Sequence, residues 1–245
     1  MGVSTSAVVV AAGLWGAVAG ALLPRAAYRF SAPEEEAWRD RCPGGHPIRG
    51  WIGRARCRRC ETPVPYDPGA PVLMIATALV CAALAAATGT RPELGVWLLL
   101  APVGVLLTVV DLRVRRLPNP LTLLFPGAAL ALLGLVALVP EHAGDWPTAL
   151  WATLAVGAGY FVLHLINPDG LGFGDVKLAF GAGAVLGWYG WATVMLGAFA
   201  GFLFGALYGW GRVLLRRAGR ESAIAFGPFL LAGAFAGLLI GAFAA

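Results

Sequence analysis

Two aspartates at the edges of apolar segments are the residues whose type and placement could do chemistry in this chain of 245 residues. Asp111 ends an apolar run, and Asp175 opens another, directly after the glycines at 172 and 174. Ionisable groups beside membrane segments are costly and usually functional. Two carboxylates in contact share a proton, so one can deprotonate a water while the other polarises a carbonyl oxygen. This is the chemistry of amide hydrolysis by aspartic proteases.

Each aspartate alone also has a structural explanation. Asp111 could be an interfacial carboxylate neutralised by Arg113 or Arg115, and Asp175 could favour the dipole at a helix start. The glycines before Asp175 permit unusual φ values and the close approach of another chain, which an extended peptide substrate requires. Two such aspartates, each inside a specific motif, favour the catalytic pair.

The elements that must position these residues are membrane helices. Hydrophobic residues make up 59% of the chain and charged residues 13%, about half the fraction usual in soluble domains. Seven charge-free runs are each long enough to cross a membrane, which takes about 17–25 helical residues. They are residues 1–24, 68–90, 94–110, 117–140, 146–168, 178–211 and 222–245. We expect a turn at Gly187–Trp191 in the 34-residue run. The prediction is an all-α membrane protein of about eight transmembrane helices.

The distribution of basic residues predicts the orientation of these helices. Seventeen of the 18 Lys and Arg residues lie in alternate connections, the last of which carries Arg212, Arg216, Arg217 and Arg220. The positive-inside rule then places both termini outside and these connections, with both aspartates, at the cytoplasmic face. The net charge of +5 follows from this topology, so we expect contact with membrane lipid and no nucleic-acid partner.

Residues 25–67 are predicted to form a small Arg- and Cys-rich cytoplasmic domain between helix 1 (1–24) and a seven-helix membrane domain (68–245). Cys57 and Cys60 have the C-x2-C spacing that binds a metal, and a structural Zn²⁺ site needs two further ligands. Cys42 and His46 could complete a Cys3His set. The alternative is a group of reduced, unligated thiols, as expected in the cytoplasm.

The chain resembles the prepilin peptidases, GxGD-type aspartic proteases of the bacterial inner membrane that remove the leader from type IV prepilins and pseudopilins. Three segments carry the resemblance: the D-x6-P-N-x-L-T element at 111–122, the GxGD element at 172–178 and the FGPF segment at 226–229. The resemblance implies a catalytic pair, Asp111 and Asp175, that needs no cofactor. The residues expected near the substrate are Pro118, Asn119, Gly172, Gly174 and Lys177.

Many members of that family also methylate the new N-terminus with S-adenosylmethionine. In this chain the loop at 25–67 is short and lacks the family's N-I-P segment, so the resemblance implies this cofactor only if the second activity is retained. His142 and His164 are interpreted as structural residues. The alternative function is an ion or proton transporter that uses Asp111 and Asp175 as a relay, although transporters place such acids near mid-membrane and often contain repeats.

Overall fold

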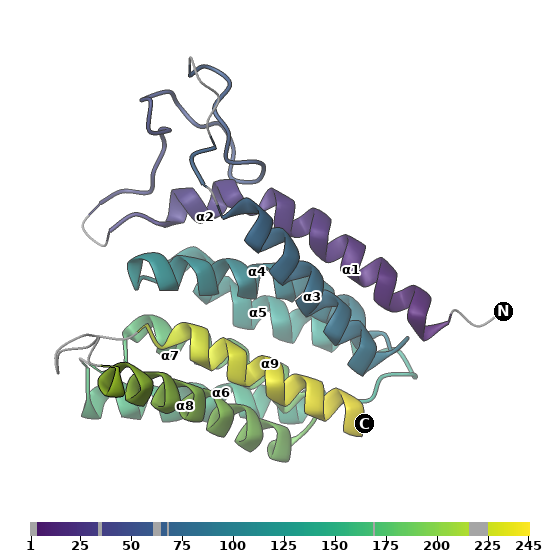
Figure 1. The fold of residues 1–245 in the computed structure, drawn as a ribbon. Helices are drawn as coiled ribbons and strands as arrows, with labels where there is room; N and C mark the ends of the chain where they lie inside the picture. The colour runs from purple at the N-terminus through teal and green to yellow at the C-terminus, as the bar shows by residue number, and fades with distance from the viewer. Residues whose placement is uncertain (1–3, 34–35, 61–64, 68, 169, 216–224) are drawn as a thin grey trace. The chain divides into compact units, whose positions relative to one another are not determined.

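The computed structural model describes residues 4–33, 36–60, 65–67, 69–168, 170–215 and 225–245. These residues form nine helices and two isolated β-bridges (Figure 1). The helices are α1 (Thr5–Leu22), α2 (Pro24–Phe30), α3 (Ala70–Thr88), α4 (Glu93–Val114), α5 (Asn119–Val136), α6 (Trp146–Ile166), α7 (Phe173–Gly187), α8 (Trp191–Leu214) and α9 (Gly227–Ala244).

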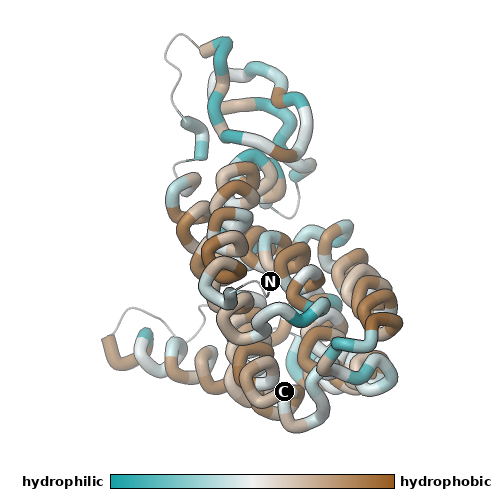
Figure 2. The backbone as a smooth tube through the Cα atoms, turned by 90° about the vertical axis from the view of Figure 1, so that its right-hand side faces the viewer, coloured by the Kyte–Doolittle hydropathy of each residue, from teal (hydrophilic) through white to brown (hydrophobic). Residues whose placement is uncertain are grey.

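Seven helices are long and apolar enough to cross a membrane: α1, α3, α4, α5, α6, α8 and α9. Their largely apolar composition is visible in Figure 2, where hydrophilic residues gather in the segment between α2 and α3. The predicted class, an all-α multi-pass membrane protein, is confirmed. The predicted turn is also confirmed, because α7 ends at Gly187 and α8 begins at Trp191. Of the predicted basic connection after α8, Arg216, Arg217 and Arg220 lie outside the described residues.

The remaining predicted span, α7, is shorter than a membrane helix. Its 15 residues extend roughly 22 Å at about 1.5 Å per residue, against a hydrocarbon core of about 30 Å. Eleven of the 15 residues are buried, and α7 packs against α5, α6, α8 and α9. A helix enclosed by protein does not have to match the thickness of the lipid.

The chain divides into two compact units. The first comprises Met1–Thr90 and Trp97–Arg116, and the second comprises Arg91–Val96 and Leu117–Ala245. Asp111 therefore belongs to the first unit and Asp175 to the second. The three domains predicted from the sequence, with boundaries after residues 24 and 67, stay a prediction.

In the first unit, α1 and α3 pack closely through glycines of α1. A Cβ atom on Gly16 would lie 2.5 Å from the carbonyl oxygen of Thr77, and one on Gly20 would lie 2.6 Å from that of Leu73. Small residues at this four-residue spacing let two helix backbones approach each other in a membrane. The Trp15 indole also donates a 2.9 Å hydrogen bond to the Leu98 carbonyl of α4.

Candidate active site and metal centre

Asp175 lies in the first turn of α7, where the helix start holds its side chain. The backbone N–H of Gly172, the N-cap residue, donates to Asp175 Oδ2 at 3.2 Å. The Asp175 side chain is buried, with 7% relative exposure of the residue. A carboxylate in the first turn also interacts favourably with the helix dipole. The GxGD segment thus positions Asp175 through its own backbone.

His164, at the end of α6, holds the segment that leads into α7. Its Nδ1 lies 2.7 Å from the Leu171 carbonyl oxygen, and because a carbonyl only accepts, Nδ1 carries the proton and donates. The His164 ring also packs against Phe173, with ring centroids 5.7 Å apart. Sequence reasoning gave His164 a general structural role and missed this specific one. The feature of the sequence that could have suggested this role is the position of His164, eight residues before Gly172.

The P-N motif and the GxGD motif meet within the second unit. Pro118 is the N-cap residue of α5, and the Thr122 hydroxyl donates to its carbonyl oxygen at 3.2 Å. Asn119, the first residue of α5, accepts a 2.8 Å hydrogen bond at Oδ1 from the ammonium of Lys177. The Lys177 ammonium also lies 4.7 Å from the ring centroid of Phe173.

Gly174 allows the P-N motif to pack closely against the GxGD motif. A Cβ atom at position 174 would lie 3.1 Å from the Cβ atom of Leu117, which is tighter than ordinary contact. The segment that begins at Leu117 therefore packs against the first turn of α7. The structure brings together five residues predicted to be near the substrate: Pro118, Asn119, Gly172, Gly174 and Lys177.

Asp111 lies in the last turn of α4, in the first unit, and is buried with 4% exposure. Arg113, one of the two cations that the sequence offers as neighbours of Asp111, makes a bidentate ion pair with Asp67, with both N–O distances at 2.8 Å. Arg115 has a φ of 52°, and its N–H donates to the Asp111 carbonyl where α4 ends. The pairing of Asp111 with Asp175 stays a prediction.

The four predicted metal ligands lie together in the segment between α2 and α3. The Sγ atoms of Cys42, Cys57 and Cys60 and a ring nitrogen of His46 lie within 4.8 Å of one another. The Cys42–Cys60 sulfur distance is 3.8 Å, and the His46 Nδ1 lies 3.5–3.8 Å from the three sulfurs. A tetrahedral zinc ion, with bonds of about 2.3 Å to sulfur and about 2.0 Å to nitrogen, requires separations of about 3.8 and 3.5 Å. The cluster therefore fits a metal ion.

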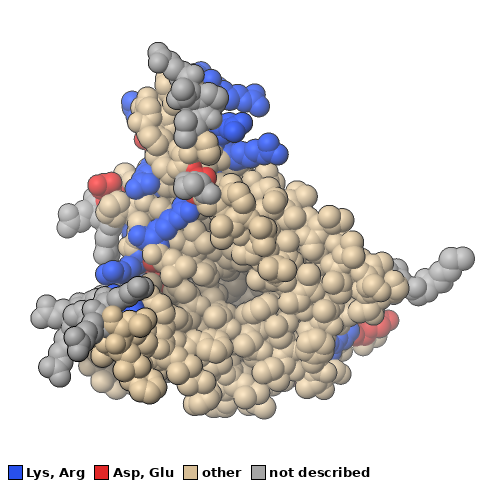
Figure 3. Space-filling model, in the orientation of Figure 1, with Lys and Arg blue, Asp and Glu red and all other residues tan. Residues whose placement is uncertain are grey.

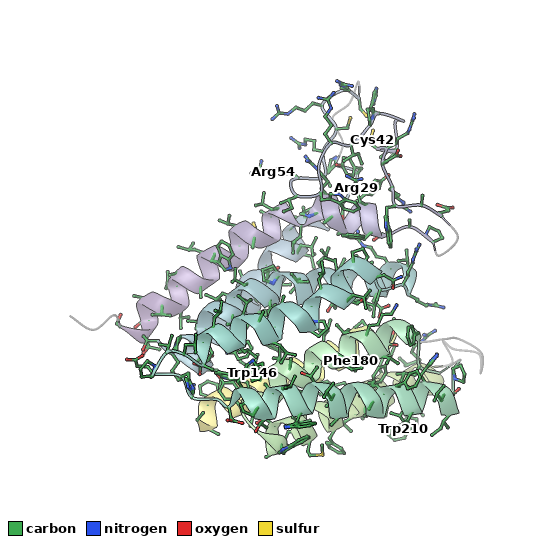
Figure 4. The ribbon with its side chains drawn as sticks, turned by 180° about the vertical axis from the view of Figure 1, so that it is seen from behind. Arg29, Cys42, Arg54, Trp146, Phe180 and Trp210 are labelled. Carbon is green, nitrogen blue, oxygen red and sulfur yellow. The ribbon has the colours of Figure 1, made fainter. Side chains whose placement is uncertain are left out.

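Local backbone structure builds this cluster. An antiparallel bridge joins Arg41 to Pro47, and the Cys42 N–H donates to the His46 carbonyl at 2.9 Å, so the two ligands lie on one turn. Gly44 lies inside the turn, where a Cβ atom would be 2.8 Å from the Cys60 sulfur. Figure 4 labels Cys42 in this segment.

The pKa values of two of the cysteine thiols are shifted in opposite directions. A hydrogen bond from the Arg59 backbone lowers the pKa of Cys57. Hydrogen bonding with Cys57 raises the pKa of Cys60 to about 11. Since a metal binds the thiolate form, metal binding to this cluster releases protons. Cys81 is separate from the cluster and lies buried in α3.

The fold and the site define a polytopic α-helical membrane protein with a GxGD aspartate at the start of a buried helix. Residues 98–210 match the type IV leader peptidase family. Curated relatives of at least 30% identity match most of the chain. The chain belongs to the type IV leader peptidase family. No solved structure matches it.

Three relatives illustrate the similarity, and each is named prepilin leader peptidase/N-methyltransferase. The protein from Aeromonas hydrophila is 35% identical over 207 residues, which cover 80% of this chain and 66% of the relative. The protein from Burkholderia pseudomallei (strain K96243) is 32% identical, with coverages of 83% and 67%. The protein from Pectobacterium carotovorum is 30% identical, with coverages of 80% and 69%. The chain thus spans about two thirds of the length of the relatives it matches.

Proposed function

We propose that this chain is a membrane aspartic endopeptidase that removes the leader peptide of type IV prepilins or pseudopilins at the cytoplasmic face. The observation that carries the proposal is the junction of the P-N and GxGD motifs, in which Lys177 donates to Asn119 beside the first turn of α7. This junction places the element that follows Asp111 in sequence directly against the element that holds Asp175.

Chain connectivity supports the pairing of the two aspartates. Asp111 is six residues before Leu117, and six residues span at most roughly 20 Å. Leu117 packs against Gly174, the residue before Asp175. Both aspartates are buried, and burial disfavours a state in which two neighbouring carboxyls are both charged.

In the proposed reaction, the ionised member of the pair takes a proton from a water molecule as that water attacks the scissile carbonyl carbon. The protonated member donates its proton to the carbonyl oxygen. Breakdown of the tetrahedral intermediate then transfers a proton to the departing amine.

Processing of a co-expressed prepilin, followed by gel shift, tests the proposal. Asp111→Asn and Asp175→Asn should each reduce cleavage by about 10²–10⁴-fold, the usual contribution of general acid–base catalysis. Asp145→Asn is the matched control, because Asp145 caps α6 and is outside the proposed pair. Normal processing by both active-site variants would refute the peptidase and leave the alternative of a transporter that uses these acids as a relay.

Two further parts of the proposal concern the segment between α2 and α3. We propose that Cys42, His46, Cys57 and Cys60 hold a structural zinc ion, supported by separations that match tetrahedral coordination. Methylation of the new N-terminus, an activity named in the relatives, would require S-adenosylmethionine. Intact-mass measurement of the processed substrate tests methylation separately, since cleavage without an added methyl group would identify a peptidase alone.

A further inference from the structure

A cavity of about 1250 Å³ lies within the first unit, between the ends of two membrane helices and the segment that carries the cysteines. Six arginines line it: Arg25, Arg49, Arg54, Arg56, Arg58 and Arg59. Figure 3 shows basic side chains gathered along one edge of this segment, and Figure 4 labels Arg54 there. A concentration of guanidinium groups around one cavity indicates an anionic ligand.

Among the described residues that line the cavity, Asp67 is the one acid. Residues 41–60 contain no Asp or Glu. Asp67, a carboxylate in the cavity wall, is already paired with Arg113. The side chains at positions 49, 54, 56, 58 and 59 are exposed, and none forms an ion pair within the part of the chain that the structure describes.

Arg25 has a different role from the other five arginines. Its guanidinium donates to the carbonyl oxygens of Arg49, at 2.8 Å, and of Ile52, at 3.1 Å, so it holds the backbone of the cavity wall. Its Nε is buried and has no hydrogen-bond partner among the described residues. A buried donor of this kind is costly unless a further group accepts from it.

The opposite wall of the cavity is apolar. It is formed by Ala21 in the last turn of α1 and by Ala70, Pro71 and Met74 in the first turns of α3. Both helices are long and apolar enough to cross the membrane, so their ends lie at the depth of the lipid headgroups. Pro71 and Met74 are exposed, which leaves an apolar path from the cavity along α3. The cavity is therefore cationic on one side and apolar on the other.

We propose that this cavity binds an anionic phospholipid, with the phosphate contacted by the exposed arginines and an acyl chain lying against the start of α3. Arginine matches phosphate oxygens with two parallel hydrogen bonds. Ligand cavities usually measure about 300–1000 Å³, so this one has room for a headgroup and the first part of its chains. A zinc ion with three thiolates nearby would add a formal charge of only about −1, so the arginines stay in excess. The site is independent of the proposed peptidase activity.

Native mass spectrometry of the full chain in detergent tests the proposal, with added phosphatidylglycerol, phosphatidylcholine or inorganic phosphate as probes. We expect stoichiometric binding of phosphatidylglycerol in preference to phosphatidylcholine. Each arginine near an anionic lipid contributes roughly fivefold to binding, so the double variant Arg49→Gln/Arg54→Gln should bind phosphatidylglycerol roughly 25-fold more weakly. Arg49→Lys/Arg54→Lys retains the charge and should bind within about fivefold of the parent.

The control variant Arg41→Gln/Arg212→Gln loses the same charge at positions outside the cavity wall and should bind like the parent. Circular dichroism and thermal unfolding establish that each variant is folded. Equal binding of the two phospholipids would overturn the proposal, as would unchanged phosphatidylglycerol binding by the folded Arg49→Gln/Arg54→Gln variant. Displacement of the lipid by inorganic phosphate at equal concentration would show a free-anion site and would overturn it as well.

Discussion

Lys177 donates a 2.8 Å hydrogen bond to Asn119 and so joins the start of α7 to the start of α5. The two residues are 58 positions apart and belong to the two motifs expected to form the active site. We expect the bond to give both residues a positioning role that can be measured apart from substrate contact.

Replacement of either partner should therefore weaken processing through the same interaction. We expect Lys177→Met and Asn119→Ala each to lower leader cleavage about 10- to 100-fold, as a hydrogen bond to a charged group contributes about 1.5–3 kcal/mol. The double variant should be little worse than either single variant, because both remove one bond. Additive losses in this cycle would mean that the two residues act independently.

The same bond can be read spectroscopically, because Lys177 is the only lysine in the chain. Reductive methylation with ¹³C-formaldehyde labels its ammonium and the terminal amine. Asn119→Ala should shift the lysine resonance, whereas His142→Ala, a change in the connection between α5 and α6, should leave it in place. A lysine resonance unchanged by Asn119→Ala would contradict the hydrogen bond.

His164 should affect activity by holding the segment before Gly172. His164→Phe keeps an aromatic ring against Phe173 and removes the hydrogen bond to the Leu171 carbonyl. Small displacements of catalytic groups reduce rates by up to about 10²-fold, so we expect a loss of about 10- to 100-fold in processing with little change in thermal stability. His142→Phe provides the comparison and should process normally. Full activity of His164→Phe would exclude the positioning role.

Metal content should depend on the turn that carries two of the four ligands as well as on the ligands. We expect about one zinc ion per purified chain by elemental analysis, with most of it lost in Cys57→Ser. Gly44→Ala should lose it too, because the new Cβ atom would lie 2.8 Å from the Cys60 sulfur. Cys81→Ser, in α3, should keep the metal. Retention of full zinc content by Cys57→Ser would eliminate this ligand set.

Asp145 should stabilise α6 in a pH-dependent way. Hydrogen bonds from Thr148 lower its pKa, so the charged form is favoured in the folded state. Its contribution is therefore present above the unfolded pKa of about 3.9 and is lost as the pH falls through the lower folded pKa. Asp145→Ala should reduce the free energy of unfolding by about 1 kcal/mol at neutral pH. Thermal unfolding at neutral and strongly acidic pH should show that the stability difference between Asp145→Ala and the parent becomes smaller in acid. A stability difference that does not change with pH would contradict this role of Asp145.

The glycines of α1 should differ in their tolerance of a side chain. Gly20→Ala would place a Cβ atom 2.6 Å from the Leu73 carbonyl oxygen and should destabilise the α1–α3 pair by about 1–3 kcal/mol. Gly13→Ala is the matched control, since its Cβ atom would meet the nearest atom at 3.7 Å. Proteolysis of the detergent-solubilised protein reports on the pair. Equal resistance of the two variants would rule out close packing at Gly20.

The sequence by itself determined the helical membrane class, the turn at Gly187–Trp191 and the set of potential metal ligands. These features depend on local properties: the length of apolar runs, the interruption of an apolar run by glycine and aromatic residues, and the spacing of cysteines. The motifs also carried the resemblance to the family, because motif spacing along the chain is visible without a structure.

Only the tertiary structure decided which distant residues contact one another. Apolar composition made α7 resemble any other span, and its burial among four helices appeared only when they packed around it. Sequence reasoning did not foresee the ion pair that Arg113 and Asp67 form in the folded first unit. The bonds from Lys177 to Asn119 and from His164 to Leu171 likewise depend on where the helix ends meet. Local sequence specifies each helix, but packing between helices selects the partners of their polar groups.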